Sequence, residues 1–179
     1  LTLDLKDNLI GEKEQLNVVM PEFDTGGEMI AEMLSINNTL TELDVSWNSI
    51  RGDAALQVAE SIEENHVIKV LILSHNAFGD EPSQKLGDVL SRHTSLKLLD
   101  LSFNGVSPKA AMVIANAFKT NESMDLLKLN GNTIGKRGAE SLLQALRRSH
   151  RVDGNLVIEI NNCDCEFEDP SLFDPVEPT

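Results

Sequence analysis

The sequence has 179 residues, of which 41% are hydrophobic and 25% charged, as is typical of a globular protein. It holds no apolar run of about 18 residues, so we expect no membrane-spanning helix. The formal net charge of −14 argues against binding to nucleic acid or to an anionic membrane, and it favours basic partner proteins. The alternative is that the acidic residues only keep the surface soluble.

Residues 1–11 are predicted to form a first strand and turn, with Leu3, Leu5, Asn8 and Ile10 at core positions whose spacing recurs later. No polar cap precedes this segment, so we expect a fragment of a longer chain with further domains. Residues 12–24 then interrupt the pattern as an insertion on one face of the array. The insertion either packs on the helices or contacts a neighbouring molecule, or it is a loop without fixed contacts.

The most regular feature is the stretch Leu40–Asn48, which recurs three more times. Its asparagine is followed by others at a constant interval of 28 residues, namely Asn76, Asn104 and Asn132. Apolar residues fill the same three positions before each asparagine, as Leu40, Leu43 and Val45 do in the first copy. An L-x-x-L-x-L-x-x-N core with this period predicts units of one strand and one returning helix.

Amphipathic segments follow these strands. Small and apolar residues recur at helical spacing in residues 53–64, 84–92, 109–119 and 137–148. Residues 26–40 align with the same segment of the next unit. We therefore expect one helix of about three turns in each unit, packed closely on its own strand.

The repeated asparagines have a predicted structural role. A side-chain amide can both donate and accept hydrogen bonds, so these residues should form an internal ladder that pairs the backbone of the turns. In the closing strand, residues 157–163, Cys163 takes the asparagine position. We interpret Cys163 as a small buried substitute rather than a nucleophile or metal ligand. Cys163 and Cys165 are too few for a disulfide scaffold or a four-ligand zinc site, which favours a reducing, cytoplasmic environment.

Residues 166–179 differ in composition from the repeats. They contain three prolines and five acidic residues and no basic residue. The prolines disfavour a helix, so we expect an acidic tail or linker. An alternative is that the tail folds back onto the basic residues of the last predicted helix.

The L-x-x-L-x-L-x-x-N pattern, its 28-residue period and the Ala/Leu-rich helices together resemble the ribonuclease-inhibitor-like class of leucine-rich-repeat proteins. The repeats occupy residues 1–165, as about five units and a closing strand. The resemblance implies an α/β solenoid in the shape of a horseshoe, with a parallel β-sheet on the concave face and α-helices on the convex face. The class includes ribonuclease inhibitor, the Ran GTPase-activating protein, and many cytosolic and ciliary proteins, which implies a cytoplasmic location that includes the cytoskeleton and the cilium.

Outward-facing residues of stacked parallel strands form columns, in which a partner would find its contacts. One column brings the rings of Trp47, His75 and Phe103 side by side, beside an apolar strip bordered by carboxylates. Exposed aromatic residues are typical of binding hot spots. We predict a protein-binding site at Glu42, Asp44, Trp47, Ile72, His75, Asp100, Phe103 and Lys128. The alternative is that the rings stack on one another and merely complete the sheet.

Catalytic motifs are missing from the sequence. It contains no glycine-rich phosphate loop, no metal-ligand cluster and no nucleophile motif, and its four histidines fall at unrelated positions. We therefore predict no catalytic residues, no cofactor and no metal. The leading hypothesis is a non-enzymatic scaffold for protein–protein interaction. The alternatives are a regulator of an enzyme, such as a GTPase-activating protein or an inhibitor, and a repeat block whose contact lies within a longer chain.

Overall fold

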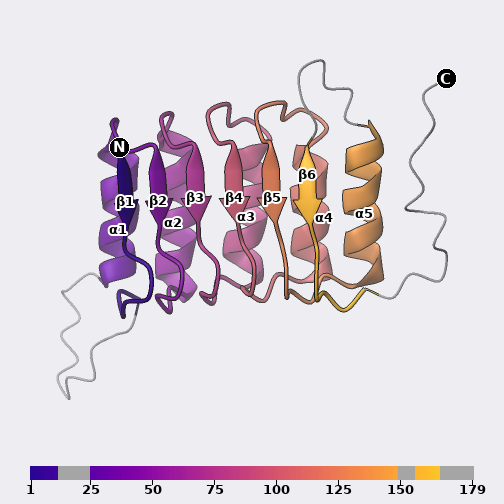
Figure 1. Ribbon diagram of the computed structural model, residues 1–179, viewed down its shortest axis with the longest axis horizontal. Coiled ribbons are helices and arrows are strands. Elements are labelled where there is room, and N and C mark those ends of the chain that lie inside the picture. The colour runs from indigo at the N-terminus through magenta and orange to yellow at the C-terminus, as the bar shows by residue number, and fades with distance from the viewer. Residues whose placement is uncertain (12–24, 149–155, 166–179) are drawn as a thin grey trace.

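Strands and helices alternate along the chain in the computed structural model, which describes residues 1–11, 25–148 and 156–165. The strands are β1 (Thr2–Asp4), β2 (Glu42–Asp44), β3 (Val70–Ile72), β4 (Leu98–Asp100), β5 (Leu126–Lys128) and β6 (Val157–Glu159). The helices are α1 (Gly26–Ile36), α2 (Gly52–Glu64), α3 (Asp80–Leu90), α4 (Pro108–Ala117) and α5 (Gly135–Arg148). The strands form one parallel sheet in sequence order, and the helices lie behind it in a second layer (Figure 1). The predicted α/β solenoid is confirmed.

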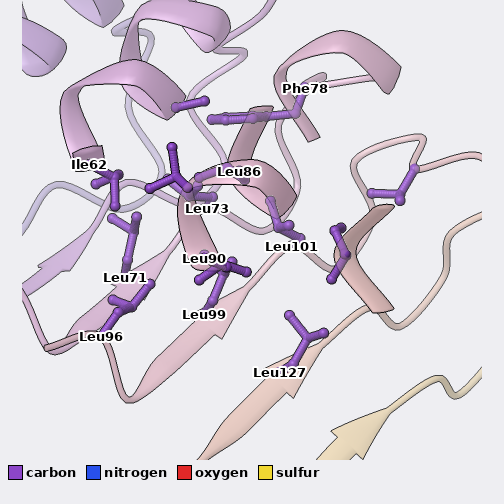
Figure 2. Packing of buried hydrophobic residues seen from close by; sticks show 14 of the residues in the cluster. Ile62, Leu71, Leu73, Phe78, Leu86, Leu90, Leu96, Leu99, Leu101 and Leu127 are labelled. Atoms are coloured by element: carbon purple, nitrogen blue, oxygen red, sulfur yellow. The ribbon is translucent and has the colours of Figure 1, made fainter. Parts of the chain in front are cut away.

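The core lies between the sheet and the helices and is built from the repeated apolar positions. Leu71 of β3 and Leu99 of β4 are register partners, and both are fully buried. They lie among Ile62 of α2 and Leu86 and Leu90 of α3 (Figure 2). Burying one such side chain contributes about 1.5–3 kcal/mol, so each repeat adds several such contributions to one continuous core.

The predicted helix bounds need one clear correction. Helix α3 begins at Asp80 rather than at residue 84, and it ends at Leu90. Its first turn contains Pro82, which a helix tolerates there because the first N–H groups have no partner inside the helix. Asp80 and Glu81 lie in the same turn and stabilise it through the helix dipole.

The predicted asparagine ladder is confirmed by its hydrogen bonds. The Asn104 Nδ2 donates to the carbonyl of Leu73 at 2.9 Å, and its Oδ1 accepts from the N–H of Phe78 at 3.3 Å. The Asn132 Oδ1 in turn accepts from the N–H of Asn104 at 2.9 Å. Each amide thus pairs backbone groups of its own repeat and of the repeat before it, which links neighbouring turns inside the protein.

Cys163 continues this ladder without an amide. Its Sγ donates to the carbonyl of Leu129 at 3.2 Å, and the side chain is half-buried. Burial raises the pKa of the Cys163 thiol, which disfavours the reactive thiolate. These observations support the predicted role as a small ladder substitute.

Asn8 departs from the prediction that it occupies a core position. Asn8 is exposed, and Leu3 and Leu5 are only half-buried. Its Nδ2 still donates to the carbonyl of Leu5 at 2.8 Å. The physical reason is that β1 is an edge strand of the sheet, so within the described residues no repeat covers its outer side.

A second ladder, which the sequence did not suggest, runs at the opposite ends of the strands. Its members again lie 28 residues apart and are Asn37, Asn65, His93 and Asn121. The Asn65 Nδ2 donates to the carbonyl of Leu34 at 2.8 Å, and its Oδ1 accepts from the N–H of Ile68 at the same distance. The pattern escaped sequence reasoning because a histidine replaces one of the amides.

His93 reproduces both functions of an amide with its two ring nitrogens. The Nδ1 accepts from the N–H of Leu96 at 3.1 Å, and the Nε2 lies 2.7 Å from the carbonyl oxygen of Asn65. This network assigns a neutral ring with its proton on Nε2. Burial lowers the pKa of His93, with the nearby His66 adding to this effect and the Asn65 hydrogen bond opposing it.

The first ladder predicts a large effect of Asn104→Ala. The substitution leaves the buried carbonyl of Leu73 and the buried N–H of Phe78 without this partner, so the free energy of unfolding should fall by about 3 kcal/mol. Urea denaturation followed by circular dichroism measures the change. Asn8→Ala, at the same repeat position but exposed, is the matched control and should cost less than about 1 kcal/mol. Equal losses in both variants would contradict the ladder's role.

The second ladder predicts a pH-dependent stability. Since the pKa of His93 is lowered in the folded protein, the unfolded chain binds more protons at mildly acidic pH. The contribution of His93 to the free energy of unfolding should therefore be complete above about pH 6.5 and should decrease as the pH falls below that value. His93→Asn keeps the ladder without a titrating group and should show a weaker pH dependence in urea titrations at pH 7.5 and 5. An unchanged dependence in this variant would refute the assignment.

Candidate functional site

The outward-facing side of the sheet, here called the sheet face, carries the predicted columns. The strand register aligns the first strand residues Glu42, Val70, Leu98, Leu126 and Val157, and the third strand residues Asp44, Ile72, Asp100, Lys128 and Glu159. Val70, Leu98 and Leu126 are half-buried, and Val157 is exposed. The predicted apolar strip with a charged border is thus present on β3 to β6.

Beside this strip, the structure brings Trp47, His75 and Phe103 together as an aromatic stack. The rings of Trp47 and His75 have centroids 3.8 Å apart and planes 11° from parallel. Those of His75 and Phe103 are 4.2 Å apart and 13° from parallel. Trp47 is nevertheless 50% exposed and Phe103 43% exposed. The rings therefore stack on one another, as one of the two alternatives expected, and also leave a large aromatic surface open.

The backbone under the aromatic stack has an uncommon conformation. Trp47, His75 and Phe103 have φ values of 58°, 55° and 56°, in the left-handed region. The same column holds Asp7, Gly131 and Asn162, which share this conformation. A bulky side chain there costs about 1–2 kcal/mol relative to glycine, so the backbone itself does not favour aromatic residues at these positions. Their presence needs another cause, and side-chain stacking or binding of a partner provides one.

Gly131 supports the stack at its β5 end. A Cβ atom added to Gly131 would lie 2.2 Å from Cε1 of Phe103. The Phe103 ring therefore lies directly over the backbone of Gly131, where any other residue would displace it. The position of Gly131, 28 residues after Phe103, puts it in the same column, but the sequence does not reveal this contact because the orientation of the Phe103 ring is set only in the folded chain.

Several charged residues of the predicted site also have structural contacts. The Oδ1 atoms of Asp44 and Asp100 accept from the N–H groups of the serines two residues later, at 2.8 and 2.9 Å. The Lys128 Nζ lies 3.8 Å from Oε2 of Glu159. Each aspartate thus uses one carboxylate oxygen to shape its own turn, and the positive charge of Lys128 is partly balanced within the sheet.

His75 is held as a neutral ring within the stack. Burial lowers the pKa of His75, the carboxylate of Asp100 opposes this shift, and the charge of Lys6 adds to it. A neutral imidazole carries no charge that would repel a cation. The aromatic stack is therefore an uncharged surface near neutral pH, with acidic residues around it.

The histidines, cysteines and acidic residues are the possible metal ligands within residues 1–11, 25–148 and 156–165. No group of three or more His, Cys, Asp or Glu side chains there is close enough to hold a metal ion. His66 is exposed, His93 belongs to the second ladder, and His75 belongs to the stack. In the same part of the chain, no helix is long and apolar enough to span a membrane. The predicted insertion at 12–24, the tail at 166–179 and His150 lie outside the described residues.

Comparison with known proteins agrees with the repeat pattern. The family model described as "Leucine Rich repeat" matches residues 37–59, 64–81, 92–115 and 120–143. No curated protein matches the chain in sequence. Among solved structures, a chain named "Leiomodin-1 Actin-Binding Site 2 (ABS2)" is similar, with a TM-score of 0.65 and 17% identity over 79% of this chain and 80% of that chain. At this identity the likeness concerns the fold alone.

The contact between Phe103 and Gly131 predicts that Gly131→Ala perturbs the stack. Its Cβ would enter the space of the Phe103 ring, so the ring-current shifts of His75 in NMR spectra should change. Gly105→Ala is the matched control, because Gly105 has a similar φ of +71° but nothing within 4 Å of an added Cβ. Both variants should lose about 1 kcal/mol of stability through backbone strain. Unchanged His75 shifts in Gly131→Ala would contradict the proposed support.

Proposed function

The chain is a leucine-rich-repeat protein, and we propose that it is a non-enzymatic scaffold that binds a partner protein on the concave sheet face and its rim. The observation that carries this proposal is the aromatic stack, which keeps Trp47 and Phe103 half-exposed on a left-handed backbone. Aromatic residues dominate binding hot spots because they bury much area with few rotatable bonds. Stacking lowers the remaining entropy cost, since the rings are already ordered before binding.

The surroundings of the stack favour a partner of a particular character. Val70, Leu98 and Leu126 provide an apolar strip next to it. Glu42 is exposed, and Asp44 and Asp100 each keep one carboxylate oxygen beyond the bond to their own turn. We infer a partner that presents apolar side chains together with basic ones, because rim charges of opposite sign speed and orient association.

We also assign the chain to the ribonuclease-inhibitor-like class, on its 28-residue period and its helices, and place its function in the cytoplasm. Free thiols at Cys163 and Cys165 support that location. Residues 1–165 would form the repeat domain, and residues 166–179 an acidic, Pro-rich tail or linker. A cytoskeletal or ciliary site within the cytoplasm fits this proposal as well.

Alanine substitution of the two exposed rings tests the proposal. Full-length protein with Trp47→Ala and Phe103→Ala should lose partners that the wild type retains in affinity purification with mass spectrometry, by about tenfold or more. Met112→Ala is the matched control, because Met112 is 46% exposed on α4 and thus on the helical side. Circular dichroism checks that each variant folds. If the Trp47→Ala/Phe103→Ala double variant keeps every partner of the wild type, the sheet face is not the binding surface.

The alternative function is regulation of an enzyme, and the acidic residues of the sheet face would then bind a basic enzyme. Two assays distinguish this regulator from a scaffold. A GTPase activator accelerates single-turnover GTP hydrolysis by its GTPase, whereas an inhibitor binds a basic enzyme with strong salt dependence.

Actin is the first scaffold partner to test, since the similar leiomodin-1 structure is named as an actin-binding site. Co-sedimentation with filamentous actin should be lost in the double variant and kept in Met112→Ala. A purified partner whose enzymatic rate changes on binding would favour the regulator.

A further inference from the structure

We propose that the β1 end of the aromatic stack is a binding site for the guanidinium group of an arginine in the partner protein, which would stack on the free face of Trp47 with its edge beside the carboxylate of Asp7. This inference rests on the proposed function, because it names a chemical group of the partner that the sheet face would bind.

Among the described residues, no aromatic ring stacks on the second face of Trp47. His75 covers one face of the indole, with centroids 3.8 Å apart, and Phe103 lies on the far side of His75. Phe103 in turn lies over Gly131 on the next strand. Within residues 1–11, 25–148 and 156–165, the stack therefore ends against Gly131 toward β5, and no further ring follows Trp47 toward β1. The 50% exposure of Trp47 agrees with a free face at that end.

Asp7 occupies the column position next to this free face. Its N–H donates to the carbonyl of Ser46 at 2.9 Å, just as the N–H of Trp47 donates to that of Ser74 at 3.0 Å. Both residues have a φ of 58°, so their side chains leave the backbone in the same direction, one strand spacing of about 4.8 Å apart. A planar group stacked on Trp47 would thus lie beside the carboxylate of Asp7.

The charges at this end favour a cation. Asp7 is exposed. Asp4, the last residue of β1, and Asp44, the last residue of β2, are register partners a few residues before Asp7 and Trp47 in their turns. Among the described residues, the ion pairs involve none of these three aspartates. Lys6 is the nearby positive charge, and it would partly oppose a second cation. The three carboxylates outnumber it, and the His75 ring behind Trp47 is neutral at pH 7 because burial lowers its pKa.

The shape of the site favours guanidinium over an ammonium group. Guanidinium is planar, is weakly hydrated, stacks on an aromatic face and presents N–H groups at its edge to a carboxylate. The ammonium of lysine is compact and strongly hydrated, so it gains less from a single flat ring. Methylated lysine is bound by cages of several aromatic rings, whereas here the stacked rings expose one face in this direction.

Trp47 allows a direct test, because it is the single tryptophan of the sequence. The full chain is titrated at constant ionic strength with N-acetyl-arginine methylamide, and with the citrulline and lysine analogues as neutral and ammonium comparators. The arginine compound should give a saturable change in Trp47 fluorescence and bind about threefold or more tightly than the lysine compound. The citrulline compound should give no saturable change.

Asp7→Asn removes the carboxylate but keeps a residue that accepts the left-handed backbone, so the fold should be retained. It should weaken arginine binding about threefold, while Asp88→Asn, on the exposed surface of α3, should leave it unchanged. Equal responses to arginine and citrulline, or an arginine affinity that Asp7→Asn does not change, would overturn the inference. In either case, loss of partners in the Trp47/Phe103 double variant would still uphold the proposed function.

Discussion

The structure depends on the pairing of buried backbone groups by side chains between neighbouring turns. A parallel solenoid must turn once after every strand, and the backbone inside that turn cannot reach water. Asn76, for example, donates to the carbonyls of Val45 and Leu73 and accepts from the N–H groups of Asn48 and Ile50. Because one amide pairs groups from two repeats, the asparagine must return at a constant interval, and each repeat must adopt the same turn.

The same turn places the candidate site. The residue before each asparagine of the first ladder has a left-handed backbone, so the side chains of that column leave the turn in one common direction. Trp47, His75 and Phe103 are thereby held at strand spacing, where their rings can stack face to face. The fold thus offers a rigid, uncharged aromatic surface beside carboxylates, and the proposed partner binding uses an arrangement that the ladder already maintains.

The sequence was sufficient for the parts of the structure that are periodic. It predicted the strands, the core positions apart from Asn8, the first ladder with Cys163 and the columns of the sheet face, since all of these follow from one repeated pattern. It did not predict the second ladder, because His93 differs from asparagine in type and only its hydrogen bonds show the equivalence. It also missed the contact between Phe103 and Gly131, because the side-chain orientation of Phe103 is determined by its neighbours in the folded protein.

The measurement that tests the account most directly is amide hydrogen exchange of the full chain with and without a purified partner. If the sheet face is the binding surface, the partner should slow exchange in the turns that carry Trp47, His75 and Phe103, and in strands β2 to β5 beside them. Exchange in the outer turns of α2 to α4 should not change. Protection confined to the helices, with the aromatic turns unaffected, would contradict the proposed binding surface.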